Sequence, residues 1–362
     1  MAVLGTPSFR MTLGEINFES KLDVKNRVIK IEVNCIADNY DKFSVELDDS
    51  DGKFLKDYRG QIKESGTAKI ALGYSGKDYF EVMDGYITKI EARRLSREKM
   101  IVVVSGCDYL HKLTRGQHRR NWFNKKDSEV ATEIAGEVGL DSSGVEASSV
   151  VHLEILQNNT TNLTFLFERA TRCGFEVDCI GKKLIFARPK KKSPVCDLIW
   201  DHSNFVASNP QHVLVQSCDF ETETSGQIKK VVVQGYDPAT NAMIEGSSDS
   251  IVAIGSGKEG PARAAENAPE DQTVKVVTNQ PVRSVEDAEK LAWSILNQQA
   301  GFFVKADGEC RGYGKIKPGE IVKMDAFGDG MDGDYIVTGA THTFDAVDKG
   351  YITQFELRRT NS

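Results

Sequence analysis

The sequence predicts a mainly β protein with an α+β insert: two tube-like antiparallel β-barrel domains plus a small α/β domain. Three observations carry this prediction. Strand-like alternation fills residues 28–112, helical spacing of apolar residues appears between 113 and 196, and strand patterns return after Trp200. A length of 362 residues is ample for more than one hydrophobic core.

The first barrel is expected at residues 25–112, after an N-terminal arm at residues 1–24. In the run VIKIEVNC, apolar Ile31 and Val33 alternate with polar side chains. Gly, Asp and Ser interrupt the strand-like runs, a pattern that is typical of antiparallel hairpins. The further strands expected here are KFSVEL (42–47), TAKIALGY (67–74), YFEVMDGYITKIEA (79–92) and KMIVVVSGCDYL (99–110).

An insert domain is expected at residues 113–196. Apolar residues fall on one helical face in 127–139 and again in 161–174, and each run ends at a glycine. Glycine suits the left-handed position that follows a helix. The run FEVDCIGKKLIFARP then predicts a short hairpin that turns near Gly181. Two helices followed by a hairpin indicate a small α/β unit.

The second barrel is expected at residues 197–362. Residues 244–280 show little periodicity and are predicted to be a long loop. Ser284, with Asp287 at the capping-box position, opens a helix predicted at 284–299. The strands of this barrel are expected at HVLVQSCDFETE, QIKKVVVQGYD, GFFVKADGEC, GEIVKMDAF, DYIVTGATHTF and GYITQFELR.

The two β regions share a short signature that suggests a duplicated barrel. Each copy comes before the final hairpin of its region. The alternative is that Met-Asp-Gly is a common turn before a strand, because Asp and Gly suit such turns. If the duplication holds, three subunits form a ring of six similar barrels, which can face a six-fold partner and a three-fold partner. The matching residues are Met83, Asp84, Gly85 and Tyr86 in the first copy and Met331, Asp332, Gly333 and Tyr335 in the second.

Charge and composition argue against several functional classes. The formal net charge of −7 argues against a protein that mainly holds nucleic acid phosphates. No apolar run reaches the roughly 18 residues that a membrane span needs, and the first residues lack the pattern of a secretory signal. The 7 cysteines are scattered and odd in number. We therefore expect buried, reduced thiols in a protein made in a reducing cytosol.

No residue pattern points to catalysis, a cofactor or a metal. The 6 histidines lack zinc-ligand spacing, HExxH and GxSxG are absent, and no cysteine lies in a nucleophile motif. His342 is expected to be a packed barrel histidine. The run GSGKEG at 255–260 lacks the spacing of a phosphate-binding loop, so a flexible loop is the favoured interpretation.

Two charged stretches leave alternatives open. Asp329, Asp332 and Asp334 could bind calcium, but the ligand order of an EF-hand is missing and a hairpin turn is favoured. The stretch RGQHRRNWFNKK mixes basic residues with Trp122 and Phe123, a composition that can bind single-stranded nucleic acid. In an acidic protein, a solvated linker or a subunit contact is the favoured interpretation.

The end of the chain, KIKPGEIVKMDAFGDGMDGDYIVTGATHTFDAVDKGYITQFELRR, resembles the baseplate hub proteins of contractile-tailed phages. These are the late control D family, and particularly the Mu-like prophage tail protein. The hub part of the type VI secretion protein VgrG is similar as well. The matching pieces are PGEIV, GDYIVT and GYITQFELRR. The order of barrel, α/β insert, split second barrel and late helix extends the resemblance to about residues 25–360.

The resemblance implies a structural homotrimer in the virion tail baseplate. Its barrels would mimic the hexameric tail tube and join it to a trimeric central spike. The implied partners are the tail tube protein, the spike protein and other baseplate proteins, with no specific nucleic acid binding, no direct membrane insertion and no cofactor. A VgrG continues into an OB-fold and a needle, whereas this sequence ends at Ser362, so the spike is expected to be a separate chain.

The alternative function is a tail-associated cell-wall hydrolase. It would need a cleft with converging carboxylates, or a Cys–His pair, made from residues far apart in the sequence. The sequence leaves that arrangement open, but the predicted strands leave no room for a separate catalytic domain, so we expect no enzyme. A carbohydrate-binding β protein would expose aromatic residues on one loop face, and Trp122, Trp200 and Trp293 are too dispersed to favour it.

Overall fold

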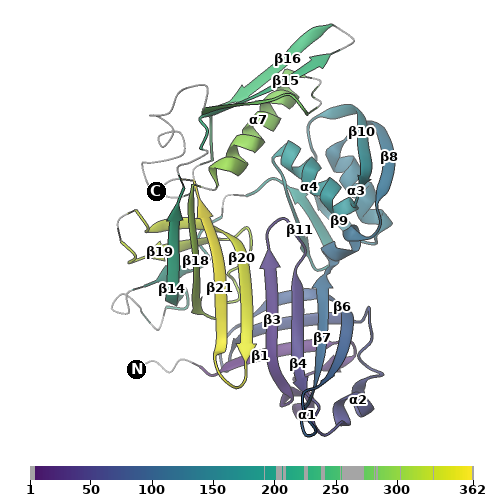
Figure 1. Ribbon diagram of the computed structural model, residues 1–362, viewed down its shortest axis with the longest axis vertical. Helices are drawn as coiled ribbons and strands as arrows, with labels where there is room; N and C mark the ends of the chain where they lie inside the picture. Colours follow the sequence, from purple (N-terminus) through teal and green to yellow (C-terminus); the bar gives the residue numbers. More distant parts are fainter. Residues whose placement is uncertain are drawn as a thin grey trace.

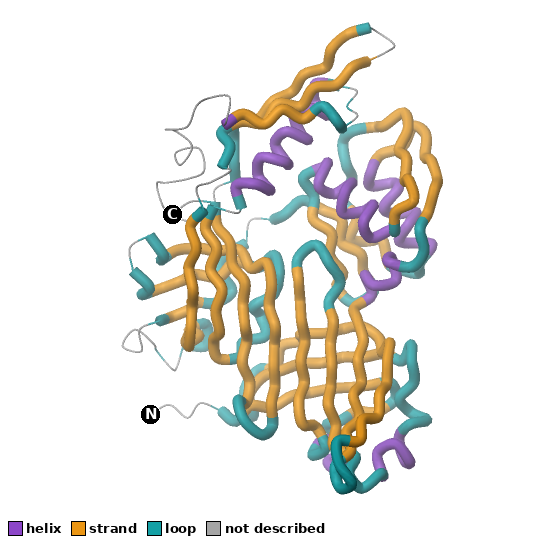
Figure 2. The backbone as a smooth tube through the Cα atoms, in the orientation of Figure 1, coloured by secondary structure: helices purple, strands orange, loops and turns teal. Residues whose placement is uncertain are grey.

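Two β-barrels lie side by side, and two smaller units with most of the helices gather at one end of them (Figure 1). Figure 2 shows the strands of both barrels as one continuous front layer. The predicted fold class, mainly β with an α+β insert, is confirmed. The computed structural model describes residues 5–190, 192–200, 206, 209–223, 227–237, 241–252, 254, 273–280, 282, 284–301, 303–328 and 330–360.

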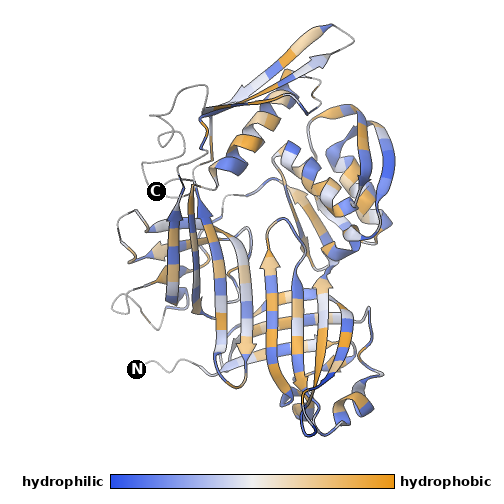
Figure 3. Ribbon diagram, in the orientation of Figure 1, coloured by the Kyte–Doolittle hydropathy of each residue, from blue (hydrophilic) through white to orange (hydrophobic). Residues whose placement is uncertain are grey.

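Seven strands and two short helices make the first barrel. Apolar and polar side chains alternate along the strands (Figure 3), and the inward set, which includes Ile31, Val33 and Val45, forms the first core. The last three strands form an antiparallel meander. The elements are β1 (Pro7–Leu13), β2 (Ile16–Asn17), α1 (Leu22–Lys25), β3 (Val28–Ile36), β4 (Lys42–Asp48), α2 (Lys53–Tyr58), β5 (Thr67–Tyr74), β6 (Tyr79–Arg94) and β7 (Met100–Asp108).

The first strand corrects the N-terminal arm expected at residues 1–24. β1 pairs with β5 along its whole length, and Phe9, Met11 and Leu13 are buried in the first core. These three residues alternate with polar ones, which is a strand signal in its own right. The first barrel therefore begins well before residue 25.

The insert packs two helices against two small sheets. The Thr161 hydroxyl caps the second helix by accepting from the backbone N–H of Thr164 at 3.2 Å, and Gly174, with φ of +67°, ends it. Both predicted helices are present. The elements are η1 (Tyr109–Thr114), β8 (His118–Lys126), α3 (Asp127–Glu137), β9 (Asp141–Val145), β10 (Val151–Thr160), α4 (Asn162–Cys173), β11 (Glu176–Ile180) and β12 (Lys183–Ala187).

Six strands close the second barrel, because β19 pairs with both β13 and β20. β13 runs parallel to both of its neighbours, so this barrel is not antiparallel throughout. A separate core fills it, with Tyr335 and Phe355 among the largest buried side chains. The strands are β13 (Asp197–Ile199), β14 (His212–Thr222), β18 (Val304–Arg311), β19 (Ile321–Asp325), β20 (Gly333–Asp345) and β21 (Gly350–Arg359).

β20 belongs to both barrels. Its first half pairs with β19, its second half pairs with β3 of the first barrel, and β21 pairs with it along most of its length. The other edge of the first barrel meets this strand through side chains. The rings of Phe9 on β1 and Phe344 on β20 pack edge to face, with centroids 5.1 Å apart.

A fourth unit places strands at the two ends of the predicted loop at 244–280, over residues 244–248 and 274–277. It consists of β15 (Lys230–Asp237), β16 (Ala242–Ser248), β17 (Val274–Val277) and α7 (Val285–Ala300) around a core of its own. The strand at 227–237 therefore lies outside the second barrel. Valines in the run VKVV favour a strand, which explains β17. The run at 255–260 lies outside the described residues.

The predicted late helix is present as α7. The Ser284 hydroxyl caps it by accepting from the N–H of Asp287 at 3.1 Å. Its buried face, which includes Leu291, packs on β15 and β16 rather than on the second barrel. Neither α7 nor any other helix in the described part of the chain is both long and apolar enough to span a membrane.

Candidate functional site

The structure places the two signature copies in the middle strands of two meanders, β5–β6–β7 and β19–β20–β21. Met83 to Tyr86 lie inside β6. Met331 and Asp332 precede β20, and Gly333 is its first residue. The first copy is therefore not a turn before a strand, whereas the second copy is.

The two signature glycines are required for different reasons. A Cβ at Gly85 would lie 2.1 Å from the carbonyl oxygen of Cys107 on the neighbouring strand. Gly333 has a φ of +129°, which side chains disfavour. The two tyrosines also differ, since Tyr86 packs in the core of the insert and Tyr335 in the second barrel. The letter-by-letter match therefore does not align equivalent positions.

A β-bulge in each meander aligns the two meanders, which the matching residues of the signature do not. It interrupts β6 at Thr88 and β20 at Thr338. The Thr88 hydroxyl donates to the carbonyl oxygen of Ser105 at 3.4 Å, and the Thr338 hydroxyl donates to that of Glu356 at 3.2 Å. In both meanders, the residue that accepts this hydrogen bond is the cross-strand partner of the residue that follows the threonine.

The turns that enter the two meanders also match. The N–H of Gly66, before β5, donates to the carbonyl oxygen of Lys63 at 3.0 Å. The N–H of Glu320, before β19, donates to that of Lys317 at 3.1 Å. Each turn therefore closes with the same hydrogen bond across three residues.

Each turn also contains a residue with a left-handed backbone, and the N–H of that residue donates to the middle strand of its meander. Ser65 has a φ of +69° and Gly319 a φ of +77°. Their N–H groups donate to the carbonyl oxygens of Ile87 and Val337, at 2.7 and 2.9 Å. Ile87 and Val337 are the residues just before the bulge threonines, so turn and bulge give one consistent alignment of residues 62–108 with 316–359.

A sequence signal for this alignment was available. The runs QIKESG and KIKPGE both contain Ile-Lys directly before the turn. Ile62 and Ile316 are both buried, with 1% and 0% of their surface exposed. The match is short and its left-handed residue differs, so sequence reasoning missed it.

The insert brings together Cys173, His152 and Asp127, which are residue types that a Cys–His hydrolase would use. His152 Nε2 lies 2.8 Å from Asp127 Oδ2, and Cys173 Sγ donates to the same oxygen at 3.1 Å. Burial, assisted by the Asp127 charge, raises the pKa of Cys173 well above its usual range. A protonated, half-buried thiol is a poor nucleophile. The cluster instead ties α3, β10 and α4 together.

A pair of buried carboxyl groups lies where the first barrel meets the insert. Asp108 Oδ2 accepts from the backbone N–H of Asp41 at 3.0 Å. Burial raises the pKa of Asp108 to about 8, with a further contribution from the charge of Asp41. Burial likewise raises the pKa of Asp41 to about 6. Among the described residues, no group of three or more His, Cys, Asp and Glu could hold a metal ion.

His342 is a packed barrel histidine, as predicted. It is fully buried. Its Nε2 lies 3.0 Å from the carbonyl oxygen of Ile316, and its Nδ1 lies 3.0 Å from the Thr353 hydroxyl. Burial lowers the pKa of His342 to about 3. The neutral ring therefore connects β20 and β21 to the turn before β19.

The two charged stretches have structural partners. In the basic stretch, Trp122 stacks on Phe165 with centroids 5.6 Å apart, and Arg120 pairs with Glu137 at 2.7 Å. These two side chains are engaged inside the insert, whereas Phe123 of the same stretch is 63% exposed. In the acidic stretch, Asp332 accepts from the N–H of Phe327 at 2.8 Å. Asp329 lies outside the described residues.

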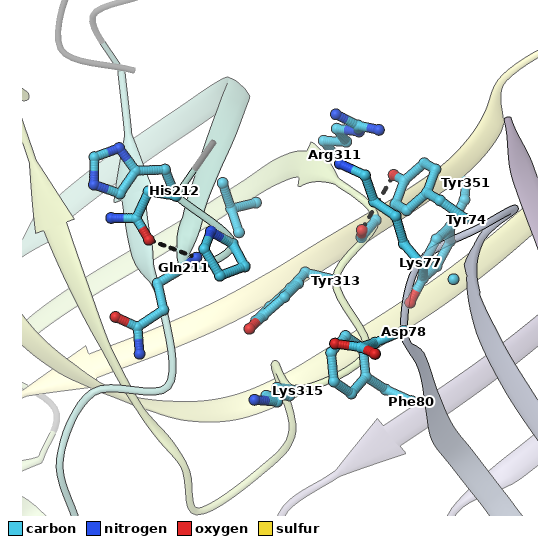
Figure 4. A pocket seen from close by; sticks show the side chains of 15 residues that line it. Tyr74, Lys77, Asp78, Phe80, Gln211, His212, Arg311, Tyr313, Lys315 and Tyr351 are labelled. Carbon is cyan, nitrogen blue, oxygen red and sulfur yellow. Dashed lines mark hydrogen bonds between the residues drawn. The ribbon is translucent and has the colours of Figure 1, made fainter. Parts of the chain in front are cut away.

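A cleft of about 470 Å³ lies between the two barrels (Figure 4). Its walls come from the turn between β5 and β6, from the start of β14, and from residues 311–315 at the end of β18. The Tyr74 hydroxyl donates to the carbonyl oxygen of Gly312 at 3.2 Å and so joins the barrels across the cleft. The sequence analysis named none of these residues, because they come together only in the fold.

Three basic side chains line this cleft: Lys77, Arg311 and Lys315. The Arg311 guanidinium lies 4.1 Å from the centre of the Tyr74 ring, and Lys315 Nζ lies 5.0 Å from that of Phe80. Within the described residues, none of the three forms an ion pair. The cleft is therefore a local positive site on an acidic protein.

The family described as the Alg8 N-terminal domain matches residues 17–346 of the sequence. The chain belongs to this family. No curated protein matches the sequence. The match extends from the first strands of the first barrel to the end of β20, so the Alg8 N-terminal domain family covers both barrels and both smaller units.

Solved structures show where the fold of this Alg8-domain chain recurs. The 43 kDa tail protein of prophage MuSo2 from Shewanella oneidensis is 14% identical, with a TM-score of 0.66 and 98% of each chain covered. The tail protein from Neisseria meningitidis MC58 is 13% identical, with a TM-score of 0.67 over 98% of this chain and 97% of that chain. The fold is therefore that of phage tail proteins.

A type VI secretion protein shares the fold as well. The E. coli c3393 protein, a component of that system, is 12% identical, with a TM-score of 0.55 over 92% of this chain and 74% of that chain. The resemblance to tail proteins inferred from the sequence is thus supported at the level of the fold.

Proposed function

We propose that this protein is the structural hub of a contractile phage or prophage tail. In this proposal a homotrimer joins the hexameric tail tube to a trimeric central spike. Two observations support the assignment. The fold is shared with two tail proteins along nearly the whole of each chain, and two similar barrels are joined edge to edge in one sheet.

The repeated meander carries the proposal. We infer that residues 62–108 and 316–359 are two copies of one ancestral unit. The support is the shared bulge at Thr88 and Thr338, together with the shared turn at Ser65 and Gly319. A chain with two such units presents six of them as a trimer, and a closed ring of that kind matches both six-fold and three-fold partners.

The outward face of the shared sheet suits the wall of a channel. A hollow of about 550 Å³ lies on this face across β3, β20, β21, β18 and β14. Polar residues line most of it, including Asn34, which donates to the Thr341 hydroxyl at 2.9 Å. Ile36, 42% exposed, is the large apolar side chain that this face presents. A polar, hydrogen-bonded wall favours water rather than a tightly packed interface.

The proposed partners follow from the geometry of a ring. The tail tube protein would meet the six barrels on one side, and a separate spike protein would meet the three-fold side. Other baseplate proteins would surround the ring in the virion tail. The described residues offer no metal-binding group and no activated thiol for a hydrolase. The Asp41–Asp108 carboxyl pair lines neither the cleft between the barrels nor the hollow on the shared sheet.

Native mass tests the proposal first. Light scattering behind size exclusion should give three chains of 40.0 kDa each, and electron microscopy of the particles should show a ring with six similar lobes. A monomer that stays a monomer after addition of the tube and spike proteins from the same gene cluster would overturn it.

A further inference from the structure

We propose that the cleft between the two barrels binds an acidic segment of a partner polypeptide that also carries an aromatic residue. This inference adds the chemistry of one partner contact and so rests on the proposed hub function. The cleft lies where both barrels meet, because the β5–β6 turn contacts residues 311–315 on one side of it, and Gln211 and His212 at the start of β14 lie across from them (Figure 4). An occupant would therefore contact both barrels at once.

Charge complementarity selects an acidic occupant. The protein carries a net charge of −7, so most of its surface repels an acidic chain. The cleft should attract an acidic chain instead, because it presents Lys77, Arg311 and Lys315. Within the described residues, none of these three forms an ion pair. Carboxylates of an occupant would supply the missing counter-charges, with arginine suited to a bidentate contact.

The aromatic walls hold the basic groups in place. Arg311 lies over Tyr74 and Lys315 over Phe80, at 4.1 and 5.0 Å from the ring centres. A cation above a ring is attracted to its face. Phe80 also packs edge to face on Tyr313, with centroids 5.2 Å apart. The same wall therefore offers ring surface to an apolar side chain beside each charge.

Two glycines keep the cleft preformed. A Cβ at Gly312 would lie 2.2 Å from the Tyr351 ring, and one at Gly314 would lie 2.7 Å from the Cβ of Phe80. Because no side chain intervenes, this segment lies flat on the aromatic residues. A preformed site loses less conformational entropy on binding.

The polar groups of the lining favour a peptide over a polyphosphate. Asp78, Asn209 and Gln211 add oxygen acceptors to the basic donors. A peptide has backbone N–H donors as well as carboxylates and can use both kinds of group. A phosphodiester chain has few donors and would leave these acceptors without partners.

Fluorescence anisotropy with three labelled probes tests the inference on the full chain. The probes are a hexapeptide that alternates glutamate and phenylalanine, its glutamine–phenylalanine counterpart, and a hexathymidylate oligonucleotide. The cleft variant is Lys77→Ala/Lys315→Ala. Its matched control is Lys56→Ala/Lys99→Ala, which removes the same charge from exposed positions outside the cleft.

The acidic peptide should bind most tightly of the three, and the cleft variant should weaken it at least tenfold while the control variant leaves it unchanged. Binding should also weaken with added salt. No binding of the acidic peptide to the wild type, equal loss in both variants, or preference for the oligonucleotide would each overturn the inference. Native mass is measured separately, so a failed trimer and an empty cleft are distinguishable.

Discussion

Ser65 and Gly319 occupy the same position in two copies of one turn, with φ values of +69° and +77°, although one of them is not glycine. Each donates its N–H to the residue before a bulge threonine. Ser65 therefore adopts a left-handed backbone conformation in which its Cβ is strained. Gly319 adopts the same conformation without that strain, because it has no Cβ.

Exchange of these two residues should have unequal effects. Gly319→Ser should lower the free energy of unfolding by about 1 kcal/mol because of the left-handed backbone, since the atom nearest to an added Cβ lies 3.9 Å away. Ser65→Gly should leave it unchanged or raise it, as relief of strain offsets the added freedom of the unfolded chain. Urea unfolding measures both, and a clear loss in Ser65→Gly would contradict the equivalence.

Asp287→Ala should lower the free energy of unfolding by about 3–5 kcal/mol, because it removes the carboxylate that faces a buried guanidinium. Arg172 on α4 donates to Asp287 on α7 at 2.6 Å, and both side chains are buried. The matched control is Glu286→Ala, which removes the exposed pair with Lys290 and should cost less than about 0.5 kcal/mol. Equal losses in chemical unfolding of the two variants would show that the buried pair has no special role.

His342→Gln should remove part of the acid sensitivity of the protein. The folded pKa of His342 is about 3 against an ordinary value of 6.5, so the unfolded state binds the proton first as pH falls. Stability from this group is thus lost progressively below pH 6.5, by about 2 kcal/mol at pH 5. The stability difference between wild type and variant should shrink by that amount from pH 7 to pH 5. A constant difference would mean that the ring is protonated in the folded state.

Asp41→Asn should stabilise the protein at pH 8 and not at pH 4. The folded pKa of Asp41 is about 6 against an ordinary 3.8. The folded state therefore keeps the proton longer, and stability falls as pH rises through about 6. The neutral amide avoids that loss, which amounts to about 3 kcal/mol once both states are ionised at pH 8. Melting temperatures at the two pH values measure the effect, and a gain at pH 4 alone would reverse the assigned sign.

Leu291→Asp should unfold the outer unit while the barrels persist. Leu291 is 4% exposed and lies in the core formed by α7, β15 and β16, so a buried charge there costs more than about 3 kcal/mol. Proteases should then cut between residues 227 and 300 first. Simultaneous loss of the barrel strands would show that the two cores fold as one.

The sequence predicted most of the elements in which one face of a segment is buried, the late helix and the strands of 28–108 among them. Ser284 and Gly174 marked helix ends through local hydrogen bonds and backbone angles, so they could be read from neighbouring residues alone. The strand β1 was missed although Phe9 and Met11 alternate, because its partner β5 is distant in the sequence. The parallel pairing of β13 left no local signal of any kind.

The cleft could not be predicted, since its walls depend on how the barrels meet. Lys77 and Arg311 are ordinary surface residues in the sequence, and their segments meet only in the fold, through contacts such as the hydrogen bond between Tyr74 and Gly312 and the packing of Phe80 on Tyr313. The signature letters that suggested a repeat do not align equivalent positions. The features that the two meanders share are backbone geometry at Thr88 and Thr338, which many sequences can adopt.

The strand shared by the two barrels has a mechanical consequence. β20 is bonded to β3 by a ladder that runs from Gly339 to Asp345, so one barrel cannot rotate against the other unless several peptide hydrogen bonds break together. A push along the strands would load that ladder in shear, with the force divided among its bonds. Under such a load, the two barrels of each chain would move as one rigid body rather than bend at the junction between them.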